Sequence, residues 1–240
     1  MIRITSCSIL LLIFLVSVKV SAEDKSNTPQ RIEVLGIEYP PFFTEAEEHG
    51  GICYVLLRDY LSNLGLDYKV IPKFVPPARA EVLLNNGRYC LSFYPPRENR
   101  EKFGFQTLGS GKVALGLIRM RQEAPFEWAS LSQFGGSTVG VLRSNKASPL
   151  VQELRDAGAE IVYFDSMLQG IKQLKAGRTD YTFGDQASLD YHVNQAGMNG
   201  SDFQMSDTVL FEAEIGFFFR KECKELLGLG SITSEGETIE

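Results

Sequence analysis

The chain has 240 residues, of which 44% are hydrophobic, 22% charged and 11% aromatic. This composition is that of an ordinary globular protein, and the length suits one large domain or two small ones. The net charge of -6 and the pI of about 5.2 argue against a nucleic-acid-binding surface, which would need a basic face. We therefore expect no nucleic-acid partner.

The N-terminus has the pattern of a secretory signal. Met1-Ile2-Arg3 gives a positive start, residues 9–18 are almost all apolar, and Val20-Ser21-Ala22 supplies the small residues of a cleavage site. The apolar run is shorter than the ~20 residues that span a bilayer. We expect cleavage after residue 22 and a soluble mature protein that is periplasmic or secreted. Lys19 lies close to the cut, so an uncleaved anchor is the alternative.

Three cysteines follow that segment, at Cys53, Cys90 and Cys223, and none has the close spacing of a metal site. We therefore predict no bound metal. Each cysteine taken singly fits a small buried apolar thiol. An oxidising compartment would permit one disulfide, and Cys53–Cys90 is the pairing we expect if one forms.

Residues 23–30 are polar, and we predict that they form a flexible lead, a segment before the first strand. After it, strand and helix patterns alternate in two successive runs. The first run predicts strands at residues 31–37, 67–71, 89–94 and 112–119, with helices at 51–64 and 77–87. The second predicts strands at 137–142, 160–164 and 180–184, with helices at 148–158, 166–176 and 186–196. Such alternation indicates parallel α/β units, so we predict two α/β lobes. Strand character over 203–220 suggests a return to the first lobe.

Ligands of parallel α/β sheets bind beyond the carboxyl ends of the strands. The residues that follow predicted strands are therefore the candidates for a site. They are Tyr39, Phe42 and Phe43 after the first strand, residues 93–100 after the third, residues 143–146 at the start of the second lobe, and Asp185.

Motifs at these positions occur in a consistent order. They include Gly36-x-x-Tyr39-Pro40-Pro41-Phe42, the charged run 97–103, Leu131-x-x-Phe134-x-Gly136, Leu174-x-x-Gly177-Arg178-x-Asp180-x-x-x-x-Asp185 and Ile215-Gly216-Phe217. Together they resemble the extracellular solute-binding proteins of amino-acid ABC importers (family 3-like), over roughly residues 31–221. The resemblance implies a two-lobed periplasmic-binding-protein-like (type II) α/β fold with a hinge and an interlobe cleft. Lobe one would comprise residues 31–119 and 209–240, lobe two residues 120–208, and hinge strands would lie near 117–121 and 208–214.

The resemblance also assigns ligand contacts. Arg100 matches the arginine that grips the ligand's carboxylate, and a guanidinium fork suits that partner. Asp185 matches the acceptor for the ligand's amino group, although an aspartate before residues 186–196 is also a good helix N-cap. Tyr39 matches the aromatic that stacks on the ligand, and Phe93 or Tyr94 could supply a second face. Phe42 and Phe93 equally suit an ordinary core.

Two departures from the pattern bear on the ligand. The loop after the second lobe's first strand reads Arg143-Ser144-Asn145-Lys146, whose cations could favour a more acidic ligand or could simply be solvated. Pro95-Pro96-Arg97 stands where a small hydroxyl residue is usual. The chain also looks short after the helix expected from Lys224, so we expect an incomplete last helix.

The resemblance implies a monomeric protein that binds an amino acid or related carboxylate, delivers it to a membrane permease by hinge closure, and needs no cofactor. A sensor or orphan binding protein, or a degenerate lobe pair without a ligand, is an alternative. A lyase or dehydratase on the same fold is another, but His49 and His192 pair in sequence with no obvious nucleophile or carboxylate. We therefore predict no catalytic residues.

Overall fold

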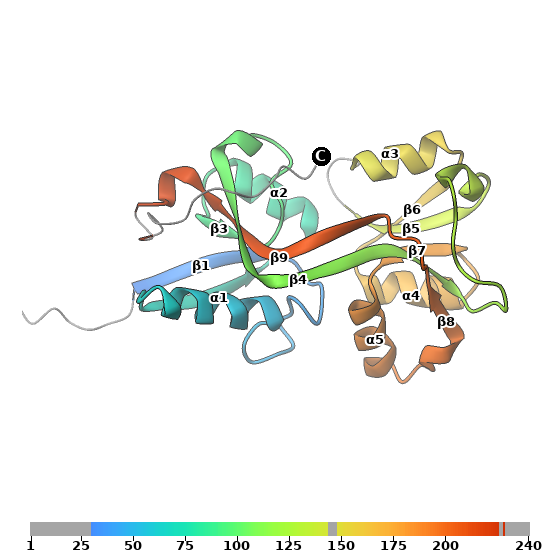
Figure 1. Cartoon of the computed structure of the whole chain (residues 1–240), viewed down its shortest axis with the longest axis horizontal. Coiled ribbons are helices and arrows are strands. Elements are labelled where there is room, and N and C mark those ends of the chain that lie inside the picture. The colour runs from blue at the N-terminus through green and yellow to red at the C-terminus, as the bar shows by residue number, and fades with distance from the viewer. Residues whose placement is uncertain (1–29, 144–147, 226–227, 229–240) are drawn as a thin grey trace, which may run out of the picture.

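The computed structural model describes residues 30–143, 148–225 and 228, and within them the chain forms two α/β lobes joined by two long strands (Figure 1). The predicted signal at 1–22 and most of the predicted lead lie outside the described residues, as does the end of the expected last helix. Among the described residues, no helix is both long and apolar enough to cross a membrane.

The first lobe carries its helices on both faces of a small parallel sheet. Its elements are β1 (Gln30–Gly36), α1 (Ile52–Asn63), β2 (Tyr68–Phe74), α2 (Pro77–Asn85) and β3 (Leu91–Ser92). β1 pairs in parallel with β2 and with β3. The two faces bury separate apolar clusters, one around Tyr54 and Leu57 of α1 and one around Ala80 and Leu84 of α2. The alternation that the sequence predicted is therefore confirmed here, with β3 shorter than expected.

The second lobe repeats this plan. Its elements are η2 (Leu131–Phe134), β5 (Thr138–Leu142), α3 (Pro149–Asp156), β6 (Glu160–Phe164), α4 (Met167–Lys175), β7 (Tyr181–Gly184), α5 (Gln186–Gln195), η3 (Gly200–Asp202) and β8 (Phe203–Met205). β5 lies between β6 and β7, parallel to both. Ser148, Ser166 and Asp185 cap α3, α4 and α5 by accepting a backbone N–H three residues on.

Two antiparallel strands, β4 (Phe103–Met120) and β9 (Phe211–Arg220), run from one lobe to the other (Figure 1). They give the strand order β2-β1-β3-β9-β4-β7-β5-β6, with β8 also paired to β4. Residues 112–115 of β4 pair with 211–214 of β9, whereas Leu117 and Ile118 already pair with β7. β4 therefore crosses between the lobes at residues 112–115, just before the segment near 117–121 that was expected to form the first hinge strand. The exact lobe boundaries stay a prediction.

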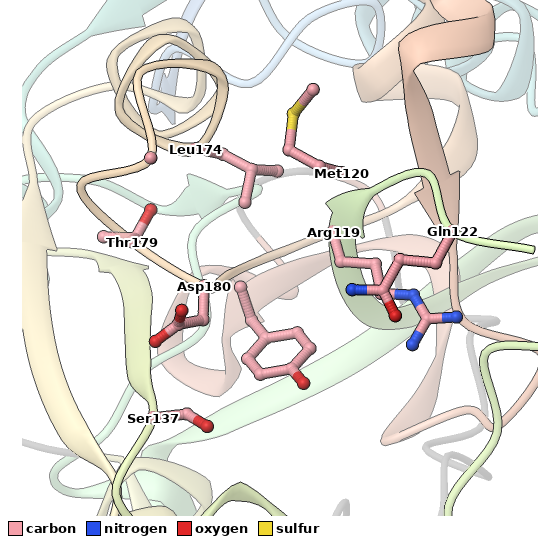
Figure 2. A pocket seen from close by; sticks show the side chains of 9 residues that line it. Arg119, Met120, Gln122, Ser137, Leu174, Thr179 and Asp180 are labelled. Carbon is pink, nitrogen blue, oxygen red and sulfur yellow. The ribbon is translucent and has the colours of Figure 1, made fainter. Parts of the chain in front are cut away.

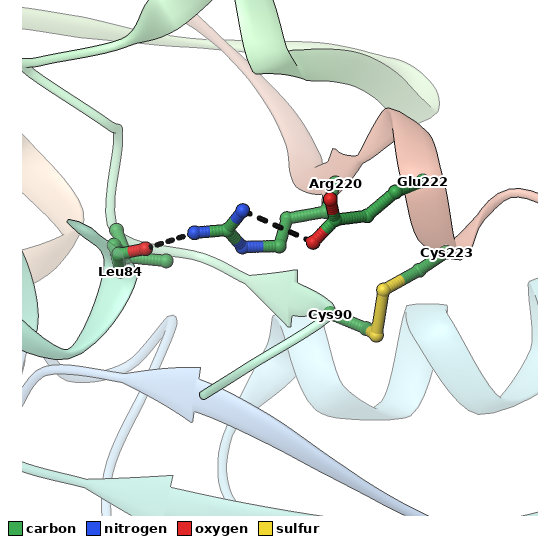
Figure 3. The surroundings of a disulfide bond; sticks show 5 residues. All are labelled: Leu84, Cys90, Arg220, Glu222 and Cys223. Carbon is green, nitrogen blue, oxygen red and sulfur yellow. Dashed lines mark hydrogen bonds and ion pairs between the residues drawn. A yellow bond between two sulfur atoms is a disulfide. The ribbon is translucent and has the colours of Figure 1, made fainter. Parts of the chain in front are cut away.

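A disulfide joins Cys90 to Cys223, so the expected Cys53–Cys90 pairing is wrong (Figure 3). The reason is the antiparallel pairing of β3 with β9, because Arg220 N donates to Cys90 O at 2.9 Å and η4 (Lys221–Cys223) follows at once. The two Cα atoms are 5.8 Å apart, a normal bridging distance. Cys53 lies in the α1 core as a free thiol, and burial raises its pKa to about 12.

Candidate ligand-binding site

The chain after β1 makes a tight turn that presents Tyr39. Tyr39 N donates to Phe43 O at 2.8 Å, and Phe43 N donates back to Tyr39 O at 3.1 Å. Between them Pro40 and Pro41 have no N–H to donate, so the strand cannot continue. The Tyr39 ring stacks on that of Phe42 with centroids 6.3 Å apart. The phenol is therefore held by a rigid turn at the carboxyl edge of the first lobe's sheet.

Asp185 occupies the corresponding position in the second lobe, directly after β7. Its Oδ1 accepts a hydrogen bond from Ser188 N at 2.9 Å, which caps α5. Its Oδ2 accepts a hydrogen bond from the hydroxyl of Tyr39 at 2.7 Å. The aspartate is only 2% exposed, so a charge-assisted hydrogen bond joins the two lobes in a desolvated place.

Two further buried polar groups follow Asp185 along α5. Ser188 is 0% exposed and its hydroxyl interacts with that of Tyr39, whereas His192 is 8% exposed and its Nε2 has no hydrogen-bond partner among the described residues. Asp185, Ser188 and His192 are three and four residues apart, which places them on one side of the helix. Sequence reasoning missed the last two, although this spacing from Asp185 could have indicated them.

Burial sets the protonation of these groups. Burial raises the pKa of the Tyr39 hydroxyl well above its usual value, the neighbouring Asp185 carboxylate raises it further, and the Ser188 hydroxyl opposes the shift. Burial lowers the pKa of His192, while Asp185 opposes that shift. At neutral pH the phenol is therefore a hydrogen-bond donor and the imidazole is uncharged.

The aromatics predicted after β3 are both in the first lobe's interior. Phe93 packs between the rings of Phe43 and Tyr54, with centroids 4.9 and 4.8 Å away, so it is a core residue in this structure. Tyr94 is buried, which raises its pKa; Arg97 opposes the shift and Glu81 adds to it. Tyr94 thus lies among charged side chains. Arg97 belongs to the candidate run 93–100, whereas Glu81 was not among the predicted site residues.

Two of the predicted cations, Arg100 and Arg143, are on the surface. Arg100 is exposed at the start of η1 (Arg100–Lys102), and its Nε donates to Pro96 O at 3.1 Å. Arg143 is also exposed, and its Nε donates to Asp165 Oδ1 at 2.9 Å. Ser144 and Asn145 lie outside the described residues. The structure therefore brings Tyr39 and Asp185 together, and the ligand-binding roles of all the predicted residues stay proposals.

No protein-family model matches the chain, and no curated protein matches it in sequence. Solved structures do match it. The arginine-bound form of truncated ArgBP from T. maritima is 22% identical at a TM-score of 0.60, over 82% of this chain and 92% of that one. The Bordetella pertussis BvgS VFT2 domain (a double mutant) is 20% identical at 0.63, over 85% and 89%. The GluR0 ligand-binding core from Nostoc punctiforme, in complex with L-glutamate, is 15% identical at 0.61, over 82% and 90%.

At these identities the comparisons establish the fold. The chain has the two-lobed periplasmic-binding-protein-like α/β fold, the architecture of amino-acid-binding proteins such as ArgBP. The fold-class prediction is confirmed.

Proposed function

We propose that this protein binds a small polar solute, an amino acid or a related carboxylate, between its two lobes, and that it does no catalysis. The observation that carries this proposal is the hydrogen bond from Tyr39 to Asp185. Each residue follows a strand of its own lobe, at the sheet edge where ligands of parallel α/β folds bind, and the two meet in a buried place.

In the proposed site, the ligand makes more contacts when the lobes are closed than when they are open. Asp185 carries a buried negative charge that Tyr39 and the Ser188 amide stabilise. A ligand ammonium would bind the same carboxylate more strongly than a neutral phenol does, because it carries a full opposite charge. Arg100, from the first lobe, would pair with the ligand's carboxylate. A ligand that touches both lobes gains these contacts only when they meet, so it shifts the open–closed population toward closure.

The comparisons support this proposal. Two of the similar structures contain arginine or L-glutamate, both of which carry an ammonium and a carboxylate. Export across a membrane and delivery to a permease follow from the sequence resemblance, and they are part of the proposal.

A thermal-shift screen of the protein against amino acids, dipeptides and small dicarboxylates tests the proposal. A ligand at 100 times its dissociation constant should stabilise the fold by about 2.7 kcal/mol, a shift of several degrees. Asp185→Asn should abolish the shift, whereas Asp190→Asn, an exposed change on the same helix, should leave it intact. A folded sample that no compound stabilises would contradict the proposal. A shift from dicarboxylates alone would contradict the role of Asp185.

A further inference from the structure

A second candidate site lies in the second lobe, in a pocket of about 250 Å³. Thr179, Asp180 and Tyr181 line it at the start of β7, whereas Asp185 follows the end of the same strand. A strand rises about 3.3 Å per residue, so the five steps from Asp180 to Asp185 put the two places roughly 16 Å apart. The pocket is therefore separate from the Tyr39–Asp185 contact.

Polar residues line two sides of the pocket (Figure 2). Thr179 and Asp180 lie on one side, and Gln122 and Arg119 from the end of β4 and the segment after it lie on the other. Leu174 of α4 adds an apolar wall. One residue with a carboxylate and one with a guanidinium thus belong to the lining of the same pocket.

The acidic side is held in place and has unused hydrogen-bonding capacity. Asp180 is exposed, and its Oδ2 accepts from both Thr138 N and Thr138 Oγ1, each at 2.8 Å. Thr179 is only 4% exposed, and its hydroxyl has no partner within the described part of the chain. Leaving a buried hydroxyl unpaired is unfavourable, so this group indicates a missing partner.

The basic side is held equally firmly. Arg119 Nε donates to Gln204 Oε1 at 3.1 Å, and Nη2 donates to the carbonyl oxygens of Ala124 and Pro125 at 2.7 and 3.2 Å. Its guanidinium carbon lies 4.2 Å from the centroid of the Phe126 ring. These contacts fix the cation and leave Nη1 without a hydrogen bond among the described residues. The position of this guanidinium is therefore set by contacts within the protein.

We propose that this pocket binds a small zwitterion, whose ammonium group contacts Asp180 and Thr179 and whose carboxylate contacts Arg119 and Gln122. The pocket volume equals that of about eight water molecules at about 30 Å³ each, which suits a small free amino acid. A molecule with one charge would satisfy only one wall and would leave the opposite charge in the pocket without a new partner.

The test follows backbone amide resonances of the isotope-labelled protein during titration with L-alanine to tens of millimolar. Amides of Gly177, Thr179 and Asp180 report the pocket, and those from Gly184 to Ser188 report the interlobe site. The pocket amides should shift, and propanoate and isopropylammonium should each bind at least about tenfold more weakly than alanine. Shifts at Gly184–Ser188 alone would overturn the pocket proposal and leave the proposed function standing.

Three variants localise the binding. Thr179→Val keeps the shape and removes the unpaired hydroxyl, so it should bind alanine about tenfold more weakly while the protein unfolds at the same temperature or higher. Asp180→Asn keeps an acceptor for Thr138 and should weaken binding by at least as much. Arg178→Gln, an exposed neighbour outside the pocket lining, should bind as the wild type does. Wild-type affinity in the first two variants, or isopropylammonium binding as tight as that of alanine, would overturn the proposal.

Discussion

The hydroxyl of Tyr39 in the first lobe lies 2.7 Å from Oδ2 of Asp185 in the second. The same carboxylate caps α5 through its other oxygen, so one buried side chain both begins a helix and joins the lobes. Under the proposed function, a ligand ammonium would therefore have to share Asp185 with Tyr39 or displace it. Lobe closure without a ligand and lobe closure around one would then depend on the same oxygen atom.

Removing the phenol hydroxyl should favour the open form. Tyr39→Phe keeps the ring that stacks on Phe42 and deletes the interlobe hydrogen bond. A hydrogen bond to a charged group contributes about 1.5–3 kcal/mol, so the ligand-free closed population should fall at least about tenfold. Small-angle scattering should show a larger radius of gyration. Tyr163→Phe, which removes an exposed hydroxyl contact with Arg155, is the matched control and should not change the radius.

Removing the Asp185 carboxylate should destabilise the fold as well as the closed form. Asp185→Ala loses the N-cap of α5, which costs about 1 kcal/mol, and leaves the buried Tyr39 hydroxyl without its acceptor. Urea unfolding should therefore show a loss of about 2–4 kcal/mol. Ser166→Ala removes the equivalent cap of α4 without an interlobe bond and should lose only about 1 kcal/mol. Equal losses in the two variants would show that the Tyr39 contact contributes nothing to stability.

The sequence predicted much of this architecture because its signals are local. Helix starts such as Ser166 and Asp185, with glycines such as Gly177 and Gly197 after the helix ends, set the element bounds closely. The disulfide and the crossing of the lobes could not be predicted in this way. They depend on β9 pairing with β3 and β4, roughly a hundred residues or more away in the chain, which no local pattern encodes.

The same limit applies to the site. Tyr39 and Asp185 each follow a strand, so the strand pattern of the sequence was enough to make both of them site candidates. Their contact, however, depends on the relative position of the two lobes. Phe93 also follows a strand, yet it packs against Phe43 and Tyr54 because β3 is central in the first lobe and both of its faces are covered. Position after a strand therefore selects candidates without showing which way a side chain points.

The Cys90–Cys223 disulfide should stabilise the protein measurably. It ties the segment after β9 to β3, 133 residues earlier in the chain, so its loss frees a long loop in the unfolded state. The Cys90→Ser, Cys223→Ser double variant should lose about 2–5 kcal/mol of unfolding free energy. A thiol reductant should lower the melting temperature of the wild type toward that of the variant and leave the variant unchanged. A wild type that is insensitive to reductant and as stable as the variant would show that the bond does not form.

His192 should make stability depend on pH. Burial lowers its pKa below the usual 6.5, and Asp185 only partly opposes this. The unfolded chain then binds a proton more readily than the folded one, so the contribution of His192 to stability is fully present above about pH 6.5 and is lost as the pH falls through the lower folded pKa. His192→Gln, which does not titrate, should flatten this part of the curve of unfolding free energy against pH. His49→Gln, a change at an exposed loop histidine, should not. If His49→Gln flattened the curve and His192→Gln did not, the burial of His192 would not be the cause.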